Sequence, residues 1–263
     1  MGIWQAVVLA IIQGITEFIP VSSSAHLLLI PLFVGWPEQG ISFDITLHLG
    51  TLTAVLLYFR REVFSLANPL NPLTQKIALA TIPAGLAALI LDGPIEAYLR
   101  STNITTLVIA ISTIVFGLLL GFGQFKEKSI VRNYRLVTYT QALLIGLVQA
   151  LALIPGASRL GVTMTAGLLL GLPRRVAAEF SFLLSIPIIL LSAAKTGLDL
   201  YKDPSLINSE LNYYLIGFGV SAIVAIASMN LFIKLIEKIG VMPFVVYRLM
   251  LGTGLLLFFY YGV

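Results

Sequence analysis

The chain is a succession of long apolar runs separated by short polar interruptions. Six runs are long enough to cross, or nearly cross, a hydrocarbon core of roughly 30 Å. They lie at about 43–59, 77–91, 104–123, 177–194, 213–233 and 243–262. No stretch between them is long enough for a soluble domain. We therefore predict an all-α integral membrane protein with about six transmembrane helices, forming a single membrane domain over residues 1–263.

Two further apolar regions, at about 3–32 and 137–172, are interrupted by polar and helix-breaking residues. The first interruption reads PVSSS from Pro20, and the second reads PGASR from Pro155. Backbone freed by such a break is tolerated at membrane depth only where protein or a watery cavity satisfies its polar groups. Each region therefore predicts a helix, a break and a second helix, as a re-entrant pair that does not cross the membrane and that borders a cavity.

The order of these elements predicts an internal repeat. A re-entrant pair followed by three spans occurs twice, in halves at about 1–125 and 135–263. Because three spans are an odd number, the halves must have opposite orientations, as in proteins built from inverted repeats. The segments QGITEFIPVSSSA and VQALALIPGASRL agree with this, since they can be overlaid with Pro20 on Pro155 and Ser23 on Ser158.

Composition and charge support a membrane protein and predict its orientation. Hydrophobic residues make up 58% of the chain and charged residues 11%, a balance typical of membrane proteins. Eleven basic residues fall in four segments, Arg60 to Lys76, Lys126 to Arg135, Arg174-Arg175 and Lys234 to Lys238, against three on the opposite side. The positive-inside rule makes the four segments cytoplasmic, so both termini and the first re-entrant pair open outward. No basic tract is dense enough to indicate a nucleic-acid partner.

The two breaks predict a meeting point near the midplane of the membrane. A charged side chain there costs at least about 2.5–3.5 kcal/mol on insertion scales, so Glu17 in the first break and Arg159 in the second each need a partner or a wet cavity. Their opposite charges allow a purely structural interpretation, a buried salt bridge between the two repeats. The neighbouring polar residues favour chemistry instead.

The second break has the features of an anion-binding site. Gly156 allows a tight turn, and the following helix start offers free backbone N–H groups beside the Ser158 hydroxyl. Arg159 adds a planar fork of donors that suits phosphate oxygens. Thr163, one turn further along, can add a hydroxyl on the same helical face. We predict that this set binds a phosphate group.

The first break supplies groups that could act on that phosphate. Gln13 and Glu17 are four residues apart, so they share a helical face and could bind a divalent cation through oxygen or position a water. The hydroxyls of Ser22, Ser23 and Ser24 lie at the break, although small residues in membrane helices also serve close packing. His26 lies three residues after Ser23 and could act as its base or as a proton donor, or could bond to a neighbouring helix. Charge neutralisation, a nucleophile and proton transfer are what phosphoryl transfer requires.

Other polar residues in the apolar runs have simpler interpretations. Asp44 and His48 are four residues apart and could line the same cavity, although a capping or interfacial role is favoured for them. Glu179 lies beside Arg174 and Arg175 and is expected to form an ion pair at the cytoplasmic face. Arg248 lies near the cytoplasmic end of its run, so we expect its side chain to reach the interface. The absence of cysteine and of Walker, GxGxxG, HExxH and EF-hand patterns disfavours thiol, nucleotide and zinc chemistry.

The sequence resembles a known family. The run QGITEFIPVSSSAHL is similar to the (E/Q)-x-x-x-E and P-V-S-S motifs, and PGASRLGVT to the P-G-x-S-R-S-G-x-T motif, of the undecaprenyl-diphosphate phosphatases, the bacitracin-resistance membrane enzymes. FDITLHLGT, EFSFLLSIP and PFVVYRLMLG also match family segments in the right order. The resemblance covers essentially the whole chain.

The resemblance implies hydrolysis of undecaprenyl diphosphate to the monophosphate carrier and inorganic phosphate in the bacterial plasma membrane, with a pocket open to the extracytoplasmic side. It implies a divalent cation, Mg²⁺ or Ca²⁺, at Gln13 and Glu17. The expected partners are the bilayer and the polyprenyl diphosphate lipid, with association into a homodimer also open. The implied catalytic residues are Glu17, Ser23, His26 and Arg159. The implied phosphate-binding residues are Ser22, Ser24, Gly156, Ser158, Arg159 and Thr163.

Two residues depart from the family pattern. Gln13 is an amide where many relatives carry a glutamate, and Leu160 replaces the serine that usually follows the arginine. If that hydroxyl faces the phosphate, turnover or substrate preference would differ. The alternative function is a polyprenyl-phosphate flippase or another transporter, because inverted repeats with broken helices also provide alternating access.

Overall fold

The computed structural model describes residues 2–102, 104–127, 134, 137–202 and 211–261, and its regular elements are helices. In chain order they are α1 (Ile3–Thr16), α2 (Ser23–Val34), α3 (Ile41–Tyr58), α4 (Arg60–Leu66), α5 (Pro72–Thr102), α6 (Thr105–Gln124), α7 (Tyr139–Gln149), the 3₁₀ turn η2 (Ala150–Leu153), α8 (Arg159–Leu169), α9 (Arg174–Lys202), α10 (Leu211–Ile239) and α11 (Met242–Tyr261). The all-α prediction is confirmed.

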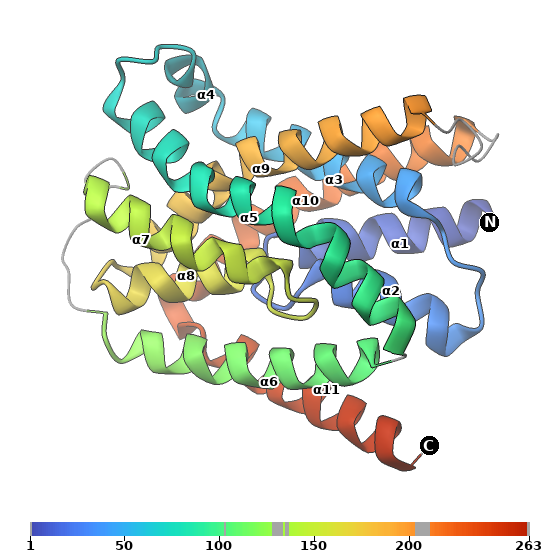
Figure 1. Ribbon diagram of the computed structural model, residues 1–263. Helices are drawn as coiled ribbons and strands as arrows, with labels where there is room; N and C mark the ends of the chain where they lie inside the picture. Colours follow the sequence, from blue (N-terminus) through green and yellow to red (C-terminus); the bar gives the residue numbers. More distant parts are fainter. Residues whose placement is uncertain (1, 103, 128–133, 135–136, 203–210, 262–263) are drawn as a thin grey trace.

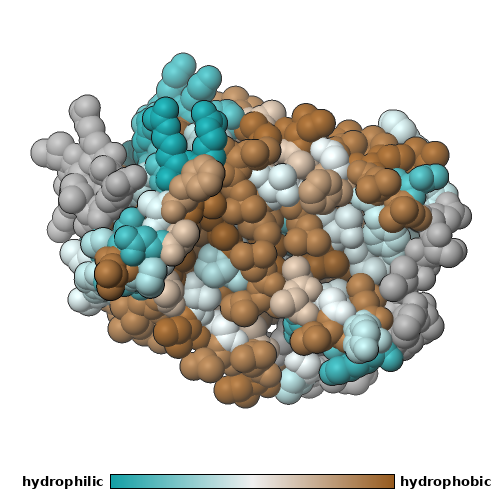
Figure 2. Space-filling model, turned by 90° about the horizontal axis from the view of Figure 1, so that it is seen from above, coloured by the Kyte–Doolittle hydropathy of each residue, from teal (hydrophilic) through white to brown (hydrophobic). Residues whose placement is uncertain are grey.

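Six of these helices are long and apolar enough to span a membrane, namely α3, α5, α6, α9, α10 and α11. They coincide with the six apolar runs of the sequence. Large apolar side chains such as Leu86 and Leu89 on α5 and Leu190 on α9 are exposed on the outside. Figure 2 shows hydrophobic surface across the middle of one face, with hydrophilic residues gathered mostly towards its ends. A surface of this kind suits contact with lipid tails.

The two interrupted regions form helix, break and helix, as the sequence predicts. The first break separates α1 from α2, and the second separates α7 and η2 from α8. The residues that cap α2 and α8, Ser22 and Ser158, both have a positive φ, of 75° and 68°. This matched backbone pairs Ser22 with Ser158, which differs by one residue from the sequence overlay of Ser23 on Ser158.

The packing of the helices is reciprocal between the two halves (Figure 1). From the first half, α1 packs against α10, while from the second half α7 packs against α5. The α3 helix packs on both α9 and α10, and α6 lies along α11. An inverted repeat would produce such exchange, and the repeat itself stays a prediction.

Ion pairs connect the basic segments at one end of the molecule. Arg174 pairs with Glu127 at 2.7 Å, and Arg175 pairs with both Glu179 and Glu237 at 2.9 Å. The predicted pairing of Glu179 is therefore confirmed. In Figure 1, α4 lies at one end, whereas α1 begins and α11 finishes at the other. Of the predicted segment from Lys126 to Arg135, residues 128–133 and 135 lie outside the described residues.

Candidate active site

A cavity of about 350 Å³ lies where the two breaks meet. The predicted meeting of the breaks is therefore confirmed. Apolar side chains from α3, α5 and α9 form part of its wall, including Ile45, Ala84 and Ile189. The polar side chains in its lining are Thr16, Glu17, Ser22, Ser23, Ser24, Asp44, His48, Gln149, Ser158, Arg159, Ser192 and Thr196. A cavity that is part polar and part apolar suits a ligand of the same kind.

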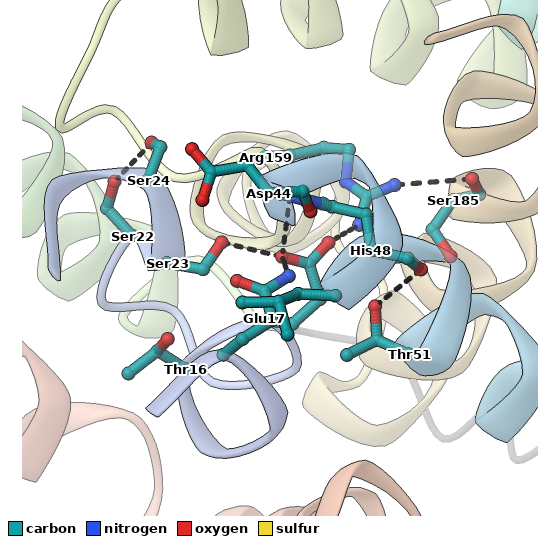
Figure 3. A network of polar contacts seen from close by, with 12 residues as sticks. Thr16, Glu17, Ser22, Ser23, Ser24, Asp44, His48, Thr51, Arg159 and Ser185 are labelled. Carbon is teal, nitrogen blue, oxygen red and sulfur yellow. Dashed lines mark hydrogen bonds and ion pairs between the residues drawn. The ribbon is translucent and has the colours of Figure 1, made fainter. Parts of the chain in front are cut away.

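The carboxylate of Glu17 is the centre of the polar contacts (Figure 3). Its Oε2 atom accepts hydrogen bonds from Ser23 Oγ at 2.6 Å and from Gln13 Nε2 at 3.0 Å. Its Oε1 atom accepts a hydrogen bond from Arg159 Nη2. Glu17 is buried, so these contacts compensate a charge that would otherwise be costly.

Arg159 completes an ion pair that the sequence allowed as a purely structural salt bridge. Its second terminal nitrogen, Nη1, donates to the backbone oxygen of Ser185 on α9 at 3.3 Å. Both Arg159 and Glu17 line the cavity, so a ligand there can reach them. The pair connects the two breaks, and its guanidinium also belongs to a residue of the cavity wall.

Two polar residues of α3, Asp44 and His48, also line the cavity near Glu17. His48 Nε2 lies 3.6 Å from Glu17 Oε2, and its Nδ1 donates to the backbone oxygen of Asp44 at 2.8 Å. Asp44 accepts a hydrogen bond from Gln39 at 2.9 Å. Both residues line the cavity, as the sequence allowed, while their capping or interfacial role stays a prediction.

The serines of the breaks and the other predicted phosphate-binding residues differ in where they point. Ser22, Ser24 and Ser158 line the cavity. Gly156 and Thr163 are not among the residues that line it. Thr163 is buried, and its hydroxyl donates back to the Arg159 carbonyl of its own helix at 2.9 Å.

The backbone of Gly156 serves the second break in a different way. Its φ of +87° suits glycine, and a Cβ there would collide with Ser112 and Thr113 on α6. The second break is therefore packed tightly against α6 at this residue.

The structure does not bring His26 to Ser23 or to the cavity. Its Nδ1 atom lies 2.7 Å from the carbonyl oxygen of Ser22, which can only accept, so Nδ1 carries the hydrogen. Its Nε2 atom then accepts from the hydroxyl of Tyr247 on α11 at 2.5 Å. Both ring nitrogens are therefore engaged away from Ser23, and the Nδ1 contact holds the Ser22 backbone.

Arg248 lies between the two breaks, and the prediction that it reaches the interface is wrong. The side chain is fully buried. Its guanidinium donates to the carbonyl of Pro20 in the first break and to those of Gly156 and Ala157 in the second, at 2.9–3.1 Å. A fourth bond reaches Thr113 on α6. Arg248 thus fixes the two breaks relative to each other.

Leu160 occupies the position of the missing family serine. Its side chain is buried in the main hydrophobic core and does not line the cavity. A serine at this position would therefore have its side chain directed towards the core. The departure from the family pattern removes no group from the cavity of this protein.

The oxygens near Glu17 fit a divalent cation only if the substrate supplies most of its ligands. Among the described residues, no group of three or more histidine or acidic side chains could hold a metal ion. Gln13 Oε1 is buried without a hydrogen-bond partner. If the Gln13 amide were turned over, this oxygen would face Glu17 Oε2. A cation between the two oxygens would stabilise that arrangement. Mg²⁺ is commonly bound by one or two carboxylates together with substrate phosphates and water, which this pair allows.

Six candidate spans around a buried site with a carboxylate, a serine hydroxyl and an arginine define a multi-pass membrane protein equipped to bind and attack a phosphate group. The profile of a family described as bacitracin resistance protein BacA matches residues 6–254. The chain belongs to this family.

Relatives are similar over nearly the whole chain. "Undecaprenyl-diphosphatase 2" of Stutzerimonas stutzeri (strain A1501) is 48% identical, covering 98% of this chain and 99% of the relative. "Undecaprenyl-diphosphatase" of Saccharophagus degradans is 50% identical, with 97% of each chain covered. "Undecaprenyl-diphosphatase" of Campylobacter concisus is 42% identical, over 98% of this chain and all of the relative (100%).

Sequence reasoning missed Gln149 and three further polar residues of the cavity lining, Thr16, Ser192 and Thr196, and it misplaced Arg248. Gln149 is a single amide in the apolar run before the second break, and an isolated polar residue at membrane depth was the available signal. It lines the cavity. For Arg248, the same signal pointed to the interface because the rotation of α11 cannot be read from the sequence.

Proposed function

We propose that this protein hydrolyses undecaprenyl diphosphate to undecaprenyl phosphate and inorganic phosphate, which recycles the lipid carrier for cell-wall synthesis and confers resistance to bacitracin. The proposal is supported by family membership and by the names of the relatives. The observation that carries it is the contact of Glu17 with both Ser23 and Arg159 at one cavity. These three groups provide an attacking hydroxyl, a proton acceptor and a phosphate-binding cation.

In the proposed reaction, the terminal phosphoryl group binds at Arg159 and the helix start that follows Ser158. Ser23 Oγ attacks the terminal phosphorus while its proton passes to Glu17, which already accepts that hydrogen bond. The bond from the terminal phosphorus to the bridging oxygen breaks, and undecaprenyl phosphate leaves. Water then hydrolyses the phosphoserine and releases inorganic phosphate.

This mechanism needs no proton donor for the leaving group. A phosphate monoester has a second pKa of about 6, so the departing oxygen carries its negative charge at neutral pH. His26, which is engaged with Ser22 and Tyr247, therefore acts on the position of the break and not on the proton. A Mg²⁺ or Ca²⁺ ion held by Gln13, Glu17 and the phosphates would supply further positive charge beside the phosphoryl group.

The surroundings of the site suggest how the lipid and the membrane are arranged. The apolar cavity wall from α3, α5 and α9 suits the first part of a polyprenyl chain. With the basic segments on the cytoplasmic side, the cavity opens to the extracytoplasmic side of the bacterial plasma membrane. The inverted repeat and the two re-entrant pairs belong to this proposal, and so does a homodimer.

The alternative is a polyprenyl-phosphate flippase or another transporter, since the same arrangement of helices suits alternating access. The experiment that separates the two is release of phosphate from undecaprenyl diphosphate by the purified protein in detergent, where no compartments exist. We expect release, and we expect it to fall when divalent cations are chelated. Intact substrate after incubation with folded protein would overturn the proposed function.

A further inference from the structure

Gln149 lies at the end of α7 and is one of the residues that line the cavity. The residue is only 2% exposed, yet neither its Oε1 nor its Nε2 has a hydrogen-bond partner. A buried amide that leaves both of its polar atoms unpaired lowers the stability of the folded chain, by about 1–3 kcal/mol for each atom. The amide therefore does not stabilise the folded state, and this points to a role for it in the cavity.

The packing of α7 holds Gln149 in place. One turn earlier, Gly146 lies so close to the backbone of Ala80 on α5 that a Cβ at Gly146 would collide with it. Ala84, one turn further along α5, lines the cavity together with Gln149. This close contact of α5 and α7 fixes the backbone from which the amide projects, so Gln149 cannot easily move to find a partner within the protein.

The neighbours of Gln149 in the cavity lining identify the chemistry of its ligand. Ser158 and Arg159 from the second break border the same cavity, and they are the phosphate-binding part of the site. Gln149 also precedes Ser158 by nine residues, the interval by which Gln13 precedes Ser22. Both serines have a positive φ, so each glutamine lies nine residues before a serine with the same unusual backbone. Gln13 donates to Glu17, whereas the amide of Gln149, a residue that lines the cavity, has no hydrogen-bond partner in the protein.

We infer that Gln149 is a substrate-binding residue, whose Nε2 donates to a non-bridging phosphoryl oxygen of the diphosphate. Its Oε1 then accepts from a water bound to the same phosphate. The inference rests on the proposed function for the identity of the lipid, and it adds a neutral contact to the charged contact of Arg159. An amide suits this place because it binds a phosphate oxygen without adding a second buried charge.

The test compares Gln149→Leu with a matched control, Ser181→Ala. Ser181 on α9 also carries a buried polar atom without a partner, but it does not line the cavity. Each protein is measured for thermal unfolding in detergent, for kcat/KM of phosphate release, and for its affinity for undecaprenyl diphosphate. We expect both variants to unfold at or above the temperature of the parent protein, because each loses unpartnered buried polar atoms.

In Gln149→Leu we expect kcat/KM and affinity to fall by about 10- to 100-fold, the range for a hydrogen bond to a charged group. Ser181→Ala should keep the parent values. An unchanged kcat/KM and affinity in Gln149→Leu would overturn the inference and leave the proposed function intact. A lower unfolding temperature with a matching loss of folded protein would also overturn it, since the role would then be structural.

The affinity measurement keeps the two proposals distinguishable. If the parent protein binds undecaprenyl diphosphate without cleaving it and Gln149→Leu weakens binding, the inference stands while the phosphatase proposal fails. If the parent protein does not bind the lipid, both fail.

Discussion

Glu17 and Arg159 are 142 positions apart in the sequence, and their side chains form an ion pair between two broken helical segments. Each residue lines the cavity, and each has further partners, Ser23 and Gln13 for Glu17 and the Ser185 carbonyl for Arg159. In the proposed mechanism, the ion pair joins the attacking group of one segment to the phosphate-binding group of the other.

Replacing Arg159 with lysine tests the need for the guanidinium. Lysine keeps the positive charge that Glu17 requires but cannot bind two groups with a planar fork. We expect Arg159→Lys to fold with an unfolding temperature close to that of the parent protein and to lose about 10²–10³-fold in kcat, as when a donor to transition-state charge is removed. A kcat within threefold of the parent would show that charge alone suffices.

His26 offers a test of positioning against proton transfer. Asparagine can place an N–H close to the position of His26 Nδ1 and so keep the hydrogen bond to Ser22, but it cannot act as a base. We expect His26→Asn to retain phosphate release within about tenfold, and His26→Ala to lose more, because the unusual backbone of Ser22 costs about 1–3 kcal/mol and needs support. An equal loss of phosphate release in both variants, together with a change in the pH profile of kcat, would instead support a role for His26 in proton transfer.

The sequence was sufficient to predict those residues of this site whose burial in a membrane is costly whichever way their side chains point. A charge at membrane depth needs a partner wherever it points, so Glu17 and Arg159 could be identified, and the helix-breaking residues between them marked the cavity. The direction of a side chain depends on how each helix is rotated and packed. His26 turns towards Tyr247, and Arg248 turns towards the breaks, for reasons that appear only when α2 and α11 are packed together.

The six spans were predictable for a similar reason, since hydrophobic length reflects the thickness of the bilayer. The register between the two breaks was not. Matching prolines suggested Ser23 opposite Ser158, whereas the backbone dihedral angles pair Ser22 with Ser158.

Arg248 is expected to be the residue on which the geometry of the two breaks depends most. In Arg248→Met the carbonyls of Pro20, Gly156 and Ala157 lose their donor while they remain buried. We expect a loss of at least about 2 kcal/mol in the free energy of unfolding. Chemical denaturation in detergent measures it, with Arg248→Lys expected to fall between the variant and the parent. Unchanged stability in Arg248→Met would contradict the role of this side chain in joining the breaks.

The central claim is that Glu17 connects Ser23 to Arg159 in one phosphate-cleaving site. Its most direct test is phosphate release from undecaprenyl diphosphate in detergent by the parent protein and by Glu17→Gln, at equal amounts of folded protein. Glutamine keeps the size of the side chain and one acceptor oxygen, but it can neither take the proton of Ser23 nor pair with Arg159 as an anion. We predict release by the parent and a loss of at least about 100-fold in the variant. A variant that releases phosphate at nearly the parent rate would contradict the account.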